Sequence, residues 1–124
     1  MARLKKYVVK EGVSILTDEL RFKDTDTDDI LEALKLVRTD DDIKPAVNLW
    51  CSDRAAAELK YGHISQWDTS AVTNMSELFN GKKDFNDDIS QWNVSNVTNM
   101  QSMFYNASAF NQPLEQWNVG NVTN

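Results

Sequence analysis

Residues 64–79 read ISQWDTSAVTNMSELF, and this pattern returns twice in the C-terminal half of the chain. Residues 89–104 read ISQWNVSNVTNMQSMF, and residues 114–124 read LEQWNVGNVTN. The offset is constant, since 92 − 67 and 117 − 92 are both 25 for the tryptophans. A fixed period of about 20–50 residues signals a unit that buries its apolar face only by stacking on its neighbours. The sequence therefore predicts stacked repeats with Trp67, Trp92 and Trp117 in one buried column.

Within one repeat the apolar spacing changes. Trp92-Asn93-Val94 alternates apolar and polar residues, which favours a short strand. Val97, Met100, Met103 and Phe104 then follow helical spacing for about two turns. Ser95 or Thr98 would cap this short helix, as Ser70 or Thr73 would in the preceding repeat, and Gly81 and Asn106 would end it in a left-handed conformation. The predicted fold is thus an α/β solenoid whose units each combine a short strand with a short helix.

The polar positions of the repeat divide into two groups. The recurrent asparagines are predicted to form ladders that satisfy backbone groups at the corners of the stack. Other polar residues are predicted to face solvent in a strip, and solenoids bind partners through such extended surfaces. The alternative is a plain solvated surface. The candidate partner-binding strip comprises Ser65, Gln66, Asp68, Ser90, Gln91, Asn93, Glu115, Gln116 and Asn118.

The pattern F-N-x-x-I-S-x-W-[DN]-x-S-x-V-T-x-M-x-x-[LM]-F resembles the repeat of BspA-like leucine-rich-repeat surface proteins. The same repeat occurs in Listeria and Mycoplasma lipoproteins and in viral proteins. Residues 62–124 carry the resemblance, and residues 49–64 look like the helix that leads into such arrays. The resemblance implies a leucine-rich-repeat-like solenoid that binds or is displayed on a surface, without known catalysis. Two features depart from it: no export signal or lipid anchor is visible, and the third repeat stops halfway.

The N-terminal half is predicted to cap the stack. We expect three parts: a docking or cap segment over residues 1–41, capping helices over 42–62, and repeats over 63–87, 88–112 and 113–124. The first part is predicted to hold a β-hairpin, from residues 4–9 and 13–16, and a helix over about 28–38. The capping segment is predicted as one amphipathic helix with Pro45 in its first turn, or as two helices restarting at Ser52-Asp53. Its inward residues would be Ile43, Ala46, Val47, Trp50, Ala57 and Leu59.

Composition excludes several classes of protein. The chain has 124 residues, a net charge of −6 and only one histidine and one cysteine. The negative charge argues against nucleic-acid binding, which needs clustered Lys and Arg. No run approaches the roughly 20 apolar residues of a membrane span. The N-terminus alone is basic, and it is predicted to dock on an acidic partner through Arg3, Lys5, Lys6 and Lys10.

Three features that could carry chemistry have simpler explanations. The run Asp24-Thr-Asp-Thr-Asp28-Asp29 resembles the start of a calcium loop, but the twelfth position holds Lys35 where a bidentate Glu belongs. Helix capping explains those acids. His63 has no nucleophile motif beside it and is predicted to be structural or exposed. Cys51 is predicted to be a small buried hydrophobe. We therefore predict no enzymatic activity, no catalytic or metal-binding residues and no cofactor.

Two functions fit these observations. The first is a protein-binding or surface-display module with an adhesion role, placed at a cell surface by its resemblance. The second is a structural accessory subunit of a larger particle, such as a viral capsid or tail, docked through the N-terminal segment. The half repeat at residues 113–124 leaves a strand edge open, and open edges pair readily. We therefore expect a longer natural chain, neighbouring subunits, or self-association at this end.

Overall fold

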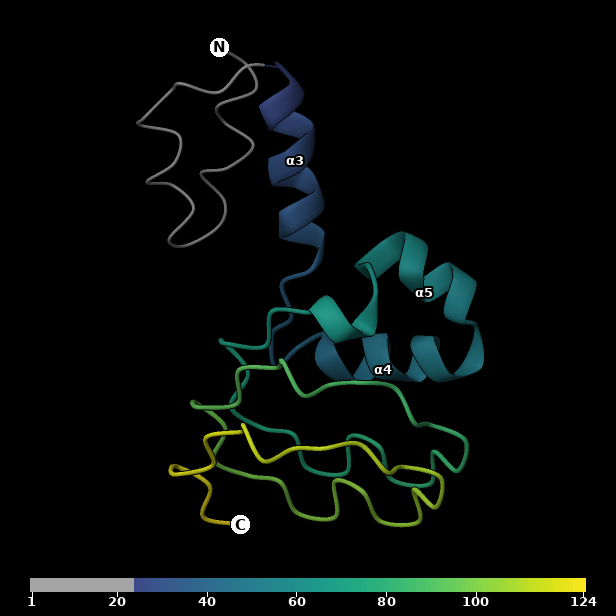
Figure 1. The fold of residues 1–124 in the computed structure, drawn as a ribbon, viewed down its shortest axis with the longest axis vertical. Coiled ribbons are helices and arrows are strands. Elements are labelled where there is room, and N and C mark those ends of the chain that lie inside the picture. Colours follow the sequence, from purple (N-terminus) through teal and green to yellow (C-terminus); the bar gives the residue numbers. More distant parts are fainter. Residues whose placement is uncertain (1–23) are drawn as a thin grey trace. The chain divides into compact units, whose positions relative to one another are not determined.

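A computed structural model describes residues 24–124 of the chain (Figure 1). The chain divides into two units between residues 34 and 35. Helix α3 begins at Asp24 and ends at Lys35, so the acidic run forms its first turns. This helix starts earlier and ends earlier than the helix predicted over residues 28–38. The predicted hairpin and the docking residues Arg3, Lys5, Lys6 and Lys10 lie outside the described residues.

Two short helices open the second unit. Helix α4 spans Ile43–Ser52 and α5 spans Arg54–Tyr61, so the chain restarts a helix at Asp53. The Asp53 carboxylate caps α5 by accepting a hydrogen bond from the Ala56 N–H, and Gly62 ends it with φ of 78°. Of the predicted inward residues, Ile43, Ala46, Val47, Trp50 and Ala57 are buried.

Leu59 corrects the prediction for the capping segment, because its side chain is 81% exposed. Ala57 is buried on α5, and a residue two positions further along a helix points to roughly the opposite side. The prediction carried the apolar spacing of one long helix through Asp53. The break at that residue resets the direction of the second helix, so Leu59 faces solvent.

The prediction of a leucine-rich-repeat-like α/β solenoid is wrong. The described part of each repeat contains no strand and no α-helix, only turns, a 3₁₀ turn at Ile64–Gln66 and isolated bridges. The positions expected to be helical instead make turns in which an N–H bonds the carbonyl three residues earlier, as Leu78 does to Met75. Glu77 and Ser102 occupy equivalent positions with φ of 59° and 58°. A left-handed residue at this point interrupts a helix, so Ser95, Thr98, Ser70 and Thr73 cap none.

The turns leave backbone groups free to join one repeat to the next. We call residues 63–87, 88–112 and 113–124 the first, second and third coils. The N–H groups of Met75, Glu77, Phe79 and Gly81 in the first coil each donate to a carbonyl of the second coil at 2.8 Å. Their acceptors are the carbonyls of Asn99, Gln101, Met103 and Tyr105. The 25-residue period is therefore a stacking period, with turns in place of strands and helices.

The tryptophan column is confirmed for its first two members. Trp67 and Trp92 are each 3% exposed, and their rings stack with centroids 6.1 Å apart and planes 15° apart. The Trp92 indole N–H donates to the Ile64 carbonyl of the preceding coil at 2.8 Å, and Trp117 donates to Ile89 in the same way at 3.0 Å. Trp117 is half-buried. Each indole thus fills the core and also joins its coil to the preceding one.

A second aromatic column runs beside the tryptophans. The Phe79 ring stacks on Phe104 of the next coil at 5.5 Å, and Phe85 stacks on Phe110 at 5.7 Å. Within each coil the two phenylalanine rings also touch, at 4.2 Å in the first and 4.5 Å in the second. Parallel-displaced aromatic pairs contribute beyond their buried area. The four rings form one continuous cluster across the interface between the coils.

The predicted asparagine ladder is confirmed. The Asn96 side-chain amide donates to the Ser70 carbonyl of the preceding coil, and Asn121 donates to Ser95 one period later, both at 2.7 Å. Other Asn and Asp side chains accept from the N–H two residues ahead, forming Asx turns at the corners. His63 takes the same role, because its Nδ1 accepts from the Ser65 N–H. One period on, Asp88 accepts from Ser90.

Asp40 supplies the first coil with the hydrogen-bond acceptors that the second coil receives from the coil before it. In the second coil, the Thr98 N–H and hydroxyl both donate to the Thr73 carbonyl. In the first coil, the Asp40 carboxylate accepts from the Thr73 N–H at 2.8 Å, the Thr73 hydroxyl at 2.7 Å and the Asn74 N–H at 3.2 Å. Burial disfavours the charged carboxylate, but these hydrogen bonds outweigh it, so the pKa of Asp40 lies below its ordinary value.

Replacing Asp40 with asparagine should lower the free energy of unfolding by about 1 kcal/mol at neutral pH, because hydrogen bonds to an exposed carboxylate are weakened. The pKa of Asp40 is lower in the folded chain than in the unfolded chain. Its stabilising effect is therefore complete above the unfolded value of about 3.9 and is lost as pH falls through the folded value. Urea denaturation of both proteins between pH 7 and pH 3 should show the difference shrinking with acid.

The neighbouring exposed residue supplies the control for this experiment. Asp41→Asn should leave the free energy of unfolding at neutral pH within about 0.5 kcal/mol of the wild-type value, as expected for an exposed surface position. Asp88, whose pKa is also lowered by hydrogen bonds from Ser90, is present in all three proteins and cancels in the comparison. A difference between wild type and Asp40→Asn that is constant from pH 7 to pH 3 would contradict the role of the charged carboxylate.

Candidate functional site

The predicted binding strip divides into side chains that the coils use and side chains that face solvent. Asp68, Asn93 and Asn118 are exposed, but each side chain accepts from the N–H two residues ahead and so belongs to a turn. The Ser65 hydroxyl is engaged by His63 Nδ1 at 2.8 Å, and Ser90 is half-buried. The exposed members outside those turns are Gln66, Gln91, Glu115 and Gln116. We call Gln66, Gln91 and Gln116 the glutamine strip.

The glutamine strip follows the period of the stack. Each glutamine directly precedes a tryptophan of the buried column. The Trp67 and Trp92 rings stack at 6.1 Å, so the adjoining glutamines lie on successive coils of the stack. Three equivalent amides on a rigid base form a regular row of hydrogen-bond donors and acceptors. This arrangement suits contact with an extended polypeptide surface.

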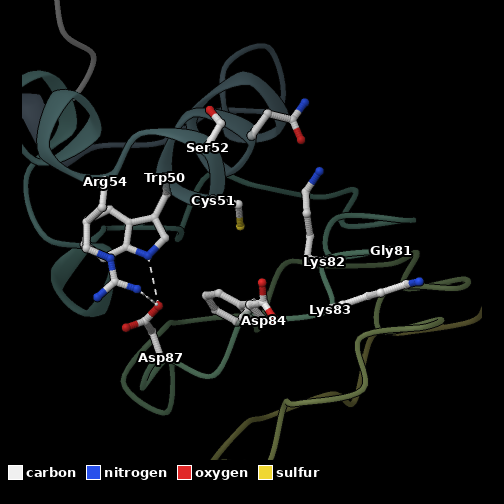
Figure 2. A pocket seen from close by; sticks show the side chains of 11 residues that line it. Trp50, Cys51, Ser52, Arg54, Gly81, Lys82, Lys83, Asp84 and Asp87 are labelled. Carbon is white, nitrogen blue, oxygen red and sulfur yellow. Dashed lines mark hydrogen bonds and ion pairs between the residues drawn. The ribbon is translucent and has the colours of Figure 1, made fainter.

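A groove that the sequence analysis did not identify lies between the capping helices and the first coil (Figure 2). Its volume is about 480 Å³. One wall comes from the end of α4 and the start of α5, and the other comes from residues 81–85 with Asp87. Figure 2 shows the Cys51 and Asp84 side chains pointing toward one another across it.

Asp87 fixes the two walls of the groove together. Its Oδ2 accepts from the Trp50 indole N–H at 3.0 Å and from the Arg54 guanidinium at 2.7 Å. The Arg54 guanidinium also lies over the Trp50 ring, 4.7 Å from its centroid. Trp50 is buried and Asp87 is half-buried, so the contact holds the capping helices against the first coil over a separation of 37 residues.

Cys51 corrects a second prediction, because it is exposed and lines the groove. Partial burial is the largest influence on its thiol and raises its pKa, while Lys82 and Arg54 act in the opposite direction. A thiol with a raised pKa is a poor nucleophile at neutral pH. Among residues 24–124, no three His, Cys, Asp or Glu side chains are grouped so that they could hold a metal ion.

The sequence contains one signal for the groove. Residues 81–84 read GKKD, whereas the equivalent positions 106–109 of the second coil read NASA. The small residues show that stacking does not require charged side chains at these positions. Lys82, Lys83 and Asp84 therefore mark the place where the first coil meets the capping helices.

The second coil has a face that the described residues leave partly open. Its Phe104 and Phe110 are half-buried, whereas the equivalent Phe79 and Phe85 of the first coil are 0% and 5% exposed. The third coil covers the part near Trp117, where the Thr123 N–H donates to the Thr98 carbonyl. Among residues 24–124, the backbone of the second coil beyond Met100 forms turns and not a strand.

A family comparison matches residues 51–124, which is 74 of the 124 residues and includes every coil and α5. The family is described as "Mycoplasma protein of unknown function, DUF285". The chain belongs to this family. The DUF285 region begins at Cys51, at the lip of the groove, and contains the glutamine strip and the open face.

The other comparisons add no relative to the DUF285 assignment. No similar curated protein and no similar solved structure was found. None of the helices within residues 24–124 is long and apolar enough to cross a lipid bilayer.

Proposed function

We propose that this chain is a non-enzymatic, protein-binding repeat module of the BspA-like type, suited to display on a surface. The exposed row formed by Gln66, Gln91 and Gln116 carries the proposal. The coils commit their apolar side chains to stacking and most corner amides and carboxylates to turns. The glutamines repeat just as regularly, yet they face solvent beside the tryptophan column.

Two further observations support a binding role. Membership of DUF285 covers the repeats and agrees with the resemblance to BspA-like proteins. Hydrogen bonds from indole N–H groups, Asx turns and backbone hydrogen bonds between coils also hold the stack together. The glutamine strip therefore lies on a rigid base. A rigid base lowers the entropy that binding must overcome.

The proposal can be tested with a displayed random-peptide library selected on the immobilised chain. We expect enriched peptides that bind the wild-type chain and lose about tenfold or more in affinity when all three glutamines are replaced by alanine, because hot-spot contacts concentrate the binding energy. The three side chains are exposed, so the triple variant should unfold at the wild-type urea midpoint.

A matched surface change supplies the control. Lys44→Ala combined with Glu58→Ala alters two exposed positions on the capping helices and should leave peptide binding unchanged. The proposal is wrong if no peptide is enriched, or if enriched peptides bind the triple glutamine variant as tightly as the wild-type chain.

A further inference from the structure

The groove collects all the lysine charge of the coils. Lys82 and Lys83 are the only lysine or arginine residues between positions 63 and 124, where six residues are acidic. Both line the groove between the capping helices and the first coil, together with Arg54 of α5. The chain as a whole has a net charge of −6. Positive charge gathered in a hollow of a negative chain attracts a ligand of the opposite sign.

The two lysine side chains have no part in the stacking of the coils. Neither ammonium group forms a hydrogen bond or an ion pair with any residue in the described part of the chain. Only the backbone is used between coils, since the Lys83 carbonyl accepts from the Ala109 N–H. The second coil carries Ala107 and Ser108 at the equivalent positions. Both ammonium groups are therefore free to pair with a ligand.

The groove exists before any ligand binds. The Asp87 carboxylate accepts from the Trp50 indole on one wall and from the Arg54 guanidinium beside it, so the capping helices and the first coil are fixed together. Figure 2 shows Lys82 extending from the coil wall toward the capping helices, beside Cys51. A ligand that enters a preformed site does not have to overcome the entropy of ordering its walls.

Asp84 decides which kind of anion suits the groove. Its carboxylate also lacks a hydrogen bond or ion pair within residues 24–124. The charged lining consists of Arg54, Lys82 and Lys83 against Asp84 and Asp87, which sums to +1. A phosphate dianion would be repelled by Asp84. An acidic peptide segment fits both signs, because its side-chain carboxylate pairs with lysine and its backbone N–H donates to a carboxylate.

We propose that the groove binds a short acidic segment of another polypeptide, with a side-chain carboxylate at Lys82 and Lys83 and a backbone N–H donated to Asp84. The volume of about 480 Å³ is in the range of sites that enclose ligands of this size. The groove shares no residue with the glutamine strip. The proposal therefore does not rest on the function proposed for that strip.

Cys51 provides the measurement that tests the proposal. It is the only cysteine of the chain, it is exposed and it lines the groove, so its rate of alkylation by iodoacetamide reports whether the groove is occupied. The rate in the full chain is followed by mass spectrometry at constant ionic strength while a capped triglutamate peptide is added up to about 1 mM. We expect a saturable slowing of about fivefold, which corresponds to a Kd of about 0.2 mM. A capped triglutamine peptide should leave the rate unchanged.

A double variant removes the proposed contact without disturbing the fold. Lys82→Ala combined with Lys83→Ser introduces the residues that the second coil already carries, so it should unfold at the wild-type urea midpoint and lose the slowing. Lys44→Ala combined with Lys60→Ala removes the same charge from exposed positions outside the groove and should keep it. Each rate is compared with that of the same variant without peptide, because Lys82 itself favours the Cys51 thiolate and so influences the thiol pKa.

Three results would overturn the proposal. Triglutamate could leave the alkylation rate unchanged, or it could slow the Lys82 and Lys83 double variant as much as the wild-type chain. Inorganic phosphate could slow alkylation as strongly as triglutamate, and the groove would then bind anions without selecting a peptide. The triple glutamine variant should respond to triglutamate as the wild type does, so a failure at the groove is distinguishable from a failure at the glutamine strip.

Discussion

Replacing Trp92 with alanine should lower the free energy of unfolding by about 3–5 kcal/mol, the range measured for large aromatic residues removed from packed cores. The ring stacks on Trp67, lies 6.0 Å from Phe79 and donates its N–H to the Ile64 carbonyl. Its loss opens a cavity and removes the shorter of two hydrogen bonds to the Ile64 carbonyl, which still accepts from the Trp67 N–H at 3.3 Å. Urea denaturation followed by far-UV circular dichroism measures the change.

Trp117→Ala is the matched control for this prediction. Trp117 makes the same hydrogen bond to the preceding coil but is half-buried. Its removal should cost about 1–2 kcal/mol, because less apolar surface returns to water. If Trp92→Ala changes the free energy of unfolding by under about 1 kcal/mol, the indole column does not hold the coils together.

The register of the stack could be predicted from the sequence, but the secondary structure of each coil could not. Identical side chains at a constant offset report which residues become neighbours, whatever backbone lies between them. The spacing of Val97, Met100 and Met103 fits helical turns, but a series of β-turns brings the same residues inward. The residue that distinguishes the two is Ser102, with φ of 58°. Serine carries no sequence signal for a left-handed conformation.

The sequence predicted those residues of the candidate sites that recur with the 25-residue period. The glutamines were identified because they recur, and the structure shows them exposed. The groove depends on contacts between Asp87 and the capping helices, more than 30 residues away in sequence. Nothing in the local pattern pairs those segments, and Cys51 was therefore assigned to the interior.

Two glycines have a positive φ but differ in the space around them. Gly62 has φ of 78° and Gly81 has φ of 76°. A β-carbon added at Gly62 would lie 2.3 Å from the Leu36 Cδ2, whereas one added at Gly81 would meet nothing within 4 Å. A positive φ costs an L-residue about 1–2 kcal/mol, and the ψ of 178° at Gly62 lies in a region that is essentially confined to glycine.

Gly62→Ala should therefore lower the free energy of unfolding by about 2–5 kcal/mol, because overpacking adds about 1–3 kcal/mol to the conformational cost. Gly81→Ala should lower it by only about 1–2 kcal/mol. Gly81→Asn should be close to neutral, since Asn106 holds the equivalent position with φ of 61° and asparagine tolerates this region. The three variants are compared by urea denaturation. Equal losses for Gly62→Ala and Gly81→Ala would mean that Leu36 moves aside freely, and that the first coil is held at this end by Asp40 and Asp87 without close packing at Gly62.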